Sequence, residues 1–187
     1  LFGDDDTLFP ISLTFGEFIF DGCILENNKH GTIKISGIKV TFKRCSFQYN
    51  KVAKSGASIY IGSSSKLINI TNCNFCSNYA EQFGGSIFSQ KINEIFISSC
   101  SFIANKADIN GGALYLDALK SDIENCNFDL NDAYNPLDDA TVGFSRGGSL
   151  YMKFYGNSRL SEGCTFTSSR AKTSGGALYV QYQVVGK

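Results

Sequence analysis

The sequence predicts an all-β solenoid, a parallel β-helix in which short strands stack coil upon coil. A motif of the form C-x-F-x-x-N, followed after a short gap by G-G-small-aliphatic-aromatic, recurs along the chain, and a fixed repeat of this length is typical of solenoids. The runs within each copy alternate as strands do, and none has a sustained helical period. The copies are residues 45–61, 73–89, 100–116 and 164–180, a copy split between 126–131 and 147–152, and a degenerate copy that begins at 23–28.

The spacing of the motif cysteines gives the length of one coil. Successive cysteines from Cys23 to Cys164 are separated by 22, 28, 27, 26 and 38 residues, so one coil takes about 27 residues. The last interval is long because sixteen residues separate Asn131 from Gly147, where other copies have six. We therefore expect a single domain over 1–187 with about six to seven coils. Its parts are an N-terminal arm or first strands (1–22), repeat coils (23–182) and a loop insertion (133–146).

Each repeat contains three strand-like runs, for example "EIFIS" before Cys100, "CSF" from that cysteine onward, and "GALYL" after the glycine pair. Stacked parallel strands place equivalent residues of neighbouring coils ~4.8 Å apart. A β-sandwich also has short strands, but it does not require the same residue at the same place in every unit. The repeat therefore favours a coil of three strands.

The repeated residue types predict three ladders of structural side chains. The cysteine and the phenylalanine two places later share one strand face, and their polar neighbours indicate that this face is inward, where Cys acts as a small apolar residue. The asparagine is expected at a turn, with its amide bonded to the amides above and below. Thiols in register point in parallel, which suits disulfides poorly, so we favour free thiols and leave the redox state open. The ladders are Cys23, Cys45, Cys73, Cys100, Cys126 and Cys164; Phe47, Phe75, Phe102, Phe128 and Phe166; and Asn28, Asn50, Asn78, Asn105 and Asn131.

The two halves of the motif resemble a known family of repeats. The pairing of F-x-x-N ("FQYN", "FCSN", "FIAN", "FDLN") with G-G-A-[ILV] ("GGSI", "GGAL", "GGSL", "GGAL") is similar to the repeats of the chlamydial polymorphic membrane proteins, within the pectin-lyase-like β-helix superfamily. The resemblance covers residues 23–180 and implies a right-handed β-helix exposed at a cell surface, often adhesive. It implies no residue-level chemistry. The copies "LENN", "FTSS" and "SGAS" depart from the pattern.

One column of the repeat is a candidate interaction surface. After the glycine pair, alternation places one set of aliphatic residues inside and the intervening aromatic rings outside, together with polar residues such as Gln90 and Asp117 that we expect to face solvent. Exposed apolar stripes mark interaction sites, and sugars or partner chains pack on them. The alternative is that the parity is inverted and the rings are core. The stripe consists of Tyr60, Phe88, Tyr115, Tyr151 and Tyr179.

An enzymatic alternative comes from the acidic residues. Many β-helices of the superfamily cleave acidic polysaccharides, and hydrolysis needs two carboxylates across the scissile bond. A loose cluster could form from Asp108, Asp132, Asp138 and Asp139, with Arg146 and Arg170 nearby. The alternative is solvated loop charge. A carboxylate cluster on one outer face would favour a polysaccharide-active enzyme, either a lyase or a glycoside hydrolase, and a carbohydrate-binding module is a further alternative. The lone His30 and the single C-x-x-C at Cys73–Cys76 argue against a metal site, and we expect no catalytic residue, metal or cofactor.

The remaining observations concern partners and location. The 17 basic and 17 acidic residues balance, and no basic run exists, so nucleic acid is not an expected partner. No apolar stretch is long enough to span a bilayer. The chain does not begin with Met and is expected to be processed or part of a longer chain. "NIT" predicts an N-glycan at Asn69 in a eukaryotic host. Because no cap helix is visible at either end, we expect end-to-end self-association, or a position inside a longer solenoid whose flanks hold the caps. The chain is expected to be an extracellular or cell-surface structural or adhesive protein, with glycans as further ligands.

Overall fold

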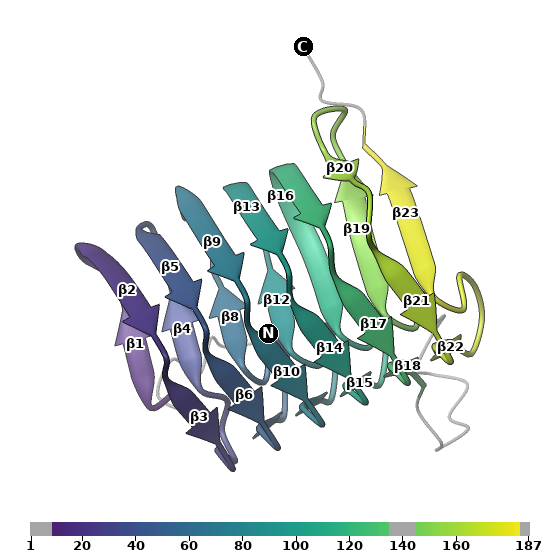
Figure 1. Cartoon of the computed structure of the whole chain (residues 1–187), viewed down its shortest axis with the longest axis horizontal. Coiled ribbons are helices and arrows are strands. Elements are labelled where there is room, and N and C mark those ends of the chain that lie inside the picture. Colours follow the sequence, from purple (N-terminus) through teal and green to yellow (C-terminus); the bar gives the residue numbers. More distant parts are fainter. Residues whose placement is uncertain (1–8, 135–144, 184–187) are drawn as a thin grey trace, which may run out of the picture.

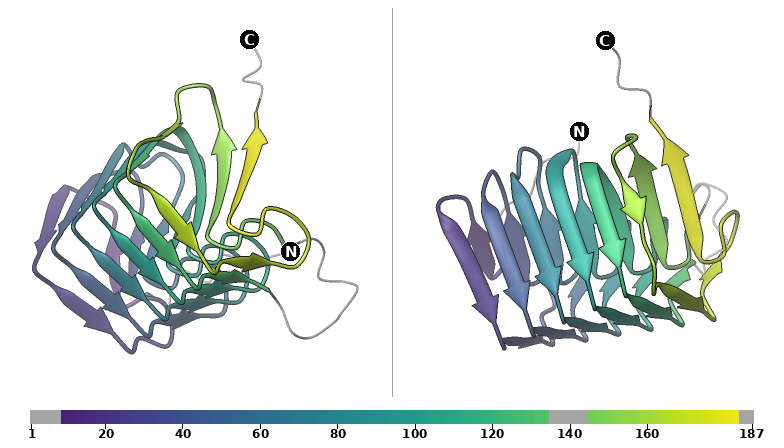
Figure 2. Two further views of the ribbon diagram at one scale, coloured as in Figure 1. Left: turned by 45° about the vertical axis from the view of Figure 1, so that its right-hand side comes forward. Right: turned by 45° about the horizontal axis from the view of Figure 1, so that its top comes forward.

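The computed structural model describes residues 9–134 and 145–183, which form a right-handed parallel β-helix without any helix among them (Figures 1 and 2). Most of the insertion expected at 133–146, including Asp138 and Asp139, lies outside the described residues. The strands form three parallel sheets of 12, 6 and 5 strands. The largest sheet bends around a corner inside β16 (Leu114–Glu124), so each coil has four sides, named here faces A to D.

Face A contains the strands that follow the glycine pair, and face B contains the strands that precede the motif cysteine. The members of face A are β1 (Ile11–Leu13), β4 (Ile33–Ile35), β8 (Ile59–Ile61), β12 (Ile87–Ser89), the start of β16, β19 (Leu150–Phe154) and β23 (Leu178–Tyr182). The members of face B are β2 (Glu17–Asp21), β5 (Lys39–Lys43), β9 (Leu67–Thr71), β13 (Ile92–Ser98), the end of β16 and β20 (Arg159–Leu160).

Faces C and D follow the cysteine and the asparagine of each repeat. Face C contains β3 (Ile24–Glu26), β6 (Ser46–Gln48), β10 (Asn74–Cys76), β14 (Ser101–Ile103), β17 (Asn127–Asp129) and β21 (Thr165–Thr167). Face D contains the two-residue strands β7 (Lys51–Val52), β11 (Tyr79–Ala80), β15 (Lys106–Ala107), β18 (Asp132–Ala133) and β22 (Arg170–Ala171). The expectation of three strands per coil was therefore wrong, because the face D strands are too short to show a period in the sequence.

The coils stack in register, so each repeated residue lies over its equivalent in the next coil. Phe75 pairs with Phe47 on one side and with Phe102 on the other, and the series continues through Phe128 to Phe166. These five rings form the inner ladder, with parallel planes and centroids 4.7–4.9 Å apart. Its first four members have no exposed surface, and Phe166 in the last coil is half-buried.

Left-handed backbone conformations turn the chain at two corners of the coil. One lies at the residue before the motif cysteine (φ 54° at Asn72) and the other at the residue before the motif asparagine (φ 54° at Ala104 and 55° at Leu130). We expected the asparagine to adopt this unusual backbone angle, but the residue before it does so instead. The asparagine lies one residue after the left-handed residue, and its side chain forms hydrogen bonds with the backbone of the turn.

The asparagine ladder satisfies the backbone inside this second corner. The Asn78 amide donates to Asn105 Oδ1 at 3.0 Å and to the carbonyl of Phe47 in the preceding coil at 3.0 Å, while its backbone N–H also donates to Asn105 Oδ1. Asn50 and Asn105 make the same set of bonds, while the Asn131 amide donates to the carbonyl of Phe102 and to Ser149 Oγ, and all these asparagine side chains are buried. Since buried polar groups are costly unless bonded, the ladder stabilises only coils that stack in register.

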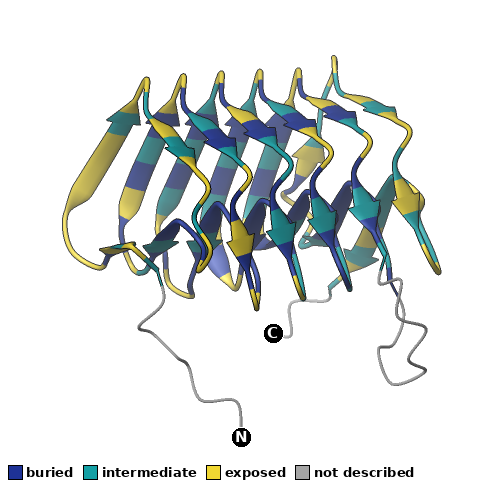
Figure 3. Ribbon diagram, turned by 90° about the horizontal axis from the view of Figure 1, so that it is seen from below, coloured by how far each residue is buried: buried dark blue, intermediate teal, exposed yellow. Residues whose placement is uncertain are grey.

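The two glycines of the pair have different structural roles. The first glycine turns the chain with positive φ, for example 66° at Gly111. The second allows two coils to approach, because a Cβ on Gly112 would collide with the carbonyl oxygen of Gly148. Figure 3 shows the result of this packing: buried residues line the middle coils, and exposed residues gather at the turns and at both end coils.

Candidate functional site

The outer side of face A carries a continuous stack of aromatic rings, named here the outer ladder. The strand register aligns its members one above another, and neighbouring ring centroids are 4.7–5.3 Å apart. The alternate residues Ile59, Leu114 and Leu150 point into the core with no exposed surface. The rings therefore lie outside the core, on the side that the alternation predicts. The outer ladder consists of Tyr60, Phe88, Tyr115, Tyr151 and Tyr179.

The rings are less exposed than a row of outward side chains suggests. Phe88 is 8% and Tyr151 is 4% exposed, and the other three rings are half-buried. The reason is the close stacking of the coils, which brings neighbouring ring centroids within 4.7–5.3 Å, so each ring covers much of the face of the next. The ladder thus presents mainly ring edges and hydroxyl groups to the outside.

Asp117 corrects a second expectation, because it is 2% exposed rather than solvent-facing. Its carboxylate accepts hydrogen bonds from Lys153 Nζ at 2.7 Å and from the Tyr155 hydroxyl at 2.8 Å. Burial and the bond to Asp117 raise the pKa of Tyr155 to about 12. Burial lowers the pKa of Lys153, but the bond to Asp117 and the neighbouring charges outweigh it, so the pKa lies above its usual value. The Lys153–Asp117 ion pair ties β16 to β19.

The outer ladder opens into a recess near its N-terminal end. The planes of Tyr60 and Phe88 are inclined by 30°, whereas those of Tyr115 and Tyr151 are inclined by only 2°. Phe83, at the glycine corner, contacts Tyr115 at 5.1 Å with an inclination of 45°. A space of about 460 Å³ lies here, which is within the range of ligand pockets. The recess is lined by Lys54, Ser55, Tyr60, Gln82, Phe83, Phe88, Gln90 and Ile109.

Cationic side chains lie over the rings along the ladder. Lys34 Nζ is 5.6 Å from the centroid of Tyr60, Lys153 Nζ is 5.8 Å from Tyr115, and the Arg146 guanidinium is 5.1 Å from Tyr179. These distances are within the range of cation–π interactions.

Two of the carboxylates considered for catalysis, Asp108 and Asp132, lie in the described part of the chain. Asp108 is 9% exposed and accepts a hydrogen bond from the Tyr79 hydroxyl at 2.7 Å, which together with burial raises the pKa of Tyr79. Asp132 pairs with Arg170 at 2.6 Å on the outside of face D. The two acids thus have separate partners, and their expected neighbours in the insertion lie outside the described residues.

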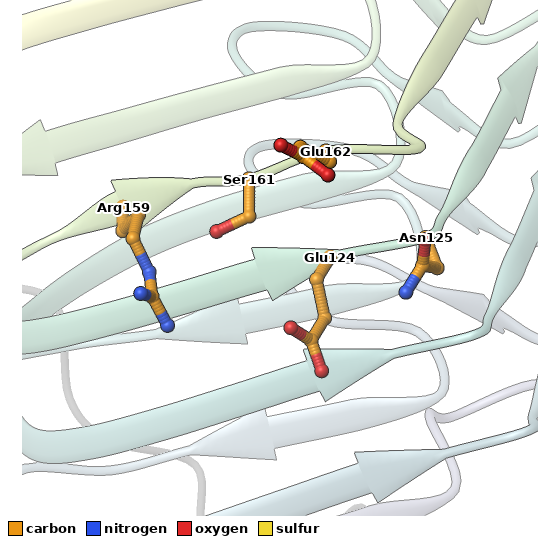
Figure 4. Close-up of a pocket in the computed structure, with 5 residues that line it drawn as sticks. All are labelled: Glu124, Asn125, Arg159, Ser161 and Glu162. Atoms are coloured by element: carbon orange, nitrogen blue, oxygen red, sulfur yellow. The ribbon is translucent and has the colours of Figure 1, made fainter.

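A second, shallow pocket of about 340 Å³ lies at the irregular corner after β20 and is lined by Glu124, Asn125, Arg159, Ser161 and Glu162. The Glu124 carboxylate points away from Glu162 (Figure 4). Arg159 is already paired with Asp122 at 3.5 Å. At this corner Leu160, rather than the residue three before Cys164, takes the core position opposite Ile123.

The cysteine ladder behaves as part of the core. All seven cysteines are free thiols, and Cys45, Cys73, Cys100 and Cys126 are at most 3% exposed. The Cys45 thiol donates to the backbone carbonyl of Lys43 at 3.2 Å, and burial raises its pKa to about 11. Cys23 and Cys164, in the first and last coils, are half-buried. The buried thiols donate to backbone carbonyls of their own coil and of the preceding coil, as Cys45 and Cys100 do.

The remaining sequence candidates are dispersed. Asn69 lies in β9 between the buried Ile68 and Ile70, so its side chain points outward, and it is half-buried. His30 is exposed at the corner between face D and face A. No group of three or more potential metal ligands exists among residues 9–134 and 145–183. In the same part of the chain, no helix is long and apolar enough to cross a membrane.

Comparison with known proteins supports one of the repeats directly. Neither the curated proteins nor the solved structures gave a match to this chain. Residues 99–117, which extend from the corner before Cys100 to the start of β16, match the family model of the Chlamydia polymorphic membrane protein repeat, so the chain contains a repeat of this type within its parallel β-helix.

Proposed function

We propose that the chain is a non-enzymatic structural or adhesive module of an extracellular or cell-surface protein, and that the outer side of face A is its interaction surface. The observation that carries the proposal is the outer ladder with its recess. Aromatic residues are enriched at protein interfaces and in ligand pockets. The repeat match supports the location, because its description names membrane proteins of Chlamydia.

The outer sides of the other faces support this assignment by contrast. On face C the outward positions are mostly polar, as in Ser46, Asn74 and Asn127. On face B they are mostly charged or polar, with Phe96 as an isolated ring beneath Lys120 at 4.6 Å. Face A is the side on which apolar rings form an unbroken row, which is typical of an interaction surface.

The polysaccharide-active enzyme remains the alternative, and the geometry favours it less. A glycosidase or lyase requires charged groups that converge on one bond, whereas Asp108, Asp117 and Asp132 are each occupied by a different partner. Incubation of the chain with polygalacturonate tests this directly. Product formation that an Asp117→Asn or Asp132→Asn change abolishes would favour the enzyme.

End-to-end association is a further part of the proposal. The same columns reach both end coils in the same register, from Ile11 to Leu178 on face A and from Leu25 to Phe166 on face C. A second copy could therefore continue the stack as the next coil, and such a contact propagates without closing. Native mass measurement over a range of concentrations tests it. A monomer at all concentrations would contradict the association without affecting the adhesive role.

Adhesion is tested with beads coated with the chain and applied to candidate host cells. We expect binding of the wild-type chain, and weaker binding of Tyr115→Ala. The matched control is Phe96→Ala, which removes an outward, half-buried ring from face B. Equal adhesion of the Tyr115→Ala and Phe96→Ala variants would contradict the assignment to face A.

Antibody labelling of intact source cells tests the cell-surface location.

A further inference from the structure

We propose that the recess on face A takes up an aromatic side chain from an extended segment of a partner protein. The inference rests on the proposed function and specifies the partner of the outer side of face A. Three observations carry it. Two rings of this chain already pack on the ladder rings at either side of the recess, a small residue occupies the position between them, and the rim of the recess is polar.

Two rings at the corner between face D and face A show how this surface holds an aromatic side chain. Phe9 lies 5.8 Å from the centroid of Tyr60, with the ring planes inclined by 52°. Phe83 lies 5.1 Å from Tyr115, with an inclination of 45°. Aromatic pairs favour such inclined contacts, in which the edge of one ring approaches the face of another. The outer ladder thus binds rings from outside its own column at two coils, with one coil between them.

Phe9 is a precedent for an added segment, because it belongs to none of the strands. It precedes β1, and its ring packs against a small apolar cluster of Val52, Ala57 and Ala80. A Cβ on Gly31 would collide with this ring, so the glycine leaves room for it. One aromatic side chain from a segment outside the sheets is therefore sufficient to fill a gap at this corner.

The coil between these two rings has a small side chain at the equivalent corner position. Ser55 precedes Gly56 as Phe83 precedes Gly84, and the Gly56 N–H donates to the Phe83 carbonyl at 3.1 Å. Ser55 lines the space of about 460 Å³ that lies here. A partner ring in this space would complete a row of three rings along the corner. The apolar lining that would surround it consists of Tyr60, Phe83, Phe88 and Ile109.

The rim of the recess suits the backbone of the segment that carries the ring. Gln82 and Gln90 line the recess beside the aromatic residues, and Gln90 is exposed. The Tyr60 hydroxyl donates to Gln90 Oε1 at 3.4 Å. Each Gln amide has donor and acceptor atoms, as a peptide backbone has. An apolar pocket with a polar rim is the type of site in which interface anchor residues are buried.

The arrangement of the rings favours a protein segment over a sugar. A sugar stacks on the open face of an aromatic ring, but Phe88 is 8% exposed and neighbouring ladder rings cover one another at 4.7–5.3 Å. An aromatic side chain can instead pack with inclined planes, as Phe9 and Phe83 do. A neutral glycan is the competing outcome of the test.

The test uses the intact chain and saturation-transfer NMR, which detects weakly bound ligands. The probe is a short capped peptide of Gly and Ser with one central Phe, and its matched control has Ala in place of that Phe. Maltohexaose is the glycan probe. We expect saturation of the Phe ring protons and none of the Ala side chain, at low and at high salt, because burial of apolar surface drives the insertion. Loss of the signal at high salt would contradict this.

Variants of the chain locate the bound ring. Ser55→Phe fills the recess with the side chain that the next coil has at the equivalent position, and it is expected to abolish the signal. The matched control is Ser174→Phe, the same change at the same corner position, where Ser174 pairs with Arg146 outside the recess. It should leave the signal unchanged. Phe83→Ala removes a recess wall and is expected to weaken binding roughly tenfold, which keeps the test decisive if Ser55→Phe does not fold. Unchanged thermal midpoints verify that each variant is folded.

Four further results would overturn the inference: no saturation of the Phe peptide, equal saturation of the Ala peptide, an equal loss with Ser174→Phe, or maltohexaose binding that Ser55→Phe abolishes. Bead adhesion distinguishes this failure from failure of the proposed function. If Tyr115→Ala reduces adhesion while Ser55→Phe does not, face A is adhesive through another part of the outer ladder, and the inference alone fails.

Discussion

Two ladders of aromatic rings run along this molecule with nearly the same spacing but in different surroundings. The inner ladder has ring planes within 1–6° of parallel, and its middle members have no exposed surface. The outer ladder varies between 2° and 30°, and three of its five rings are half-buried. Packing on all sides forces the inner rings into one orientation. The open side of face A allows the outer rings to fan apart, and the recess forms where they do.

The comparison separates stability from recognition. Both ladders result from the same repeat, since coils in register stack any residue on its equivalent. The difference lies in what covers the rings laterally: Cys and aliphatic columns inside, and cations and amides outside. We therefore expect substitutions in the inner ladder to act on folding, and substitutions in the outer ladder to act on binding.

The largest expected effect is that of Phe102→Ala in the middle of the inner ladder. Phe102 has no exposed surface and stacks at 4.8 Å on Phe75 and at 4.9 Å on Phe128. Truncation of a core Phe leaves a cavity and costs roughly 3–5 kcal/mol. Thermal unfolding should show a midpoint lower by roughly 6–20 °C for a chain of this size. An unchanged midpoint would show that the inner ladder is not part of the folded core.

Asn105→Ala should have the next largest effect, because it interrupts the polar ladder beside the rings. The change leaves the Phe75 carbonyl without the Asn105 amide, and the Asn78 amide and backbone N–H without their shared acceptor. Buried groups left without partners cost about 1–3 kcal/mol each, reduced here by any water that enters. The control is Asn74→Ala, an exposed asparagine on face C. Urea unfolding of the two variants should separate them, and equal midpoints would contradict a structural role for the ladder.

Tyr115→Ala should be milder. The ring is half-buried and stacks on Phe88 and Tyr151, at 5.2 and 4.7 Å. Exposed stacking of this kind contributes about 0.5–1.5 kcal/mol per pair beyond the area it buries. The thermal midpoint should fall by less than it does for Phe102→Ala, while bead adhesion falls by more. If Tyr115→Ala destabilises the chain as much as Phe102→Ala, the distinction between the two ladders fails.

The sequence was sufficient for what depends on periodicity. The repeat placed the phenylalanine, cysteine and asparagine columns and the parity of face A, because the coil length fixes which residues stack. It did not indicate the left-handed corners at Tyr49, Ala104 and Leu130, whose residue types have no preference for that conformation. Stacking bonds on both sides of the corner hold these angles, and such bonds are a property of the assembled coils.

The features missed at the candidate site arise from contacts between coils. Alternation predicts on which side of the strand a residue lies, but it does not predict how far the side chain is exposed. It therefore could not show that the stacked rings of the outer ladder cover each other. The burial of Asp117 depends on Lys153 and Tyr155, which lie 36 and 38 residues later and belong to the next coil. The recess depends on ring inclinations, which no sequence pattern encodes.

The smallest effect on stability is expected at Asn69, which tests whether the outer sides of the coil differ in accessibility. The sequon "NIT" lies in β9 on face B, where Asn69 points outward between Thr41 and Phe96 of the neighbouring coils. An N-glycan there would project away from the core, and face A would stay uncovered. In a eukaryotic host we expect an intact mass above that of the bare chain, and loss of the excess with Asn69→Gln. The variant should change the unfolding free energy by no more than about 0.5 kcal/mol, as surface substitutions do.

An intact mass equal to the bare sequence would contradict the glycan. Reduced bead adhesion of Asn69→Gln would instead indicate that face B shares the interaction surface, against the assignment to the outer ladder alone.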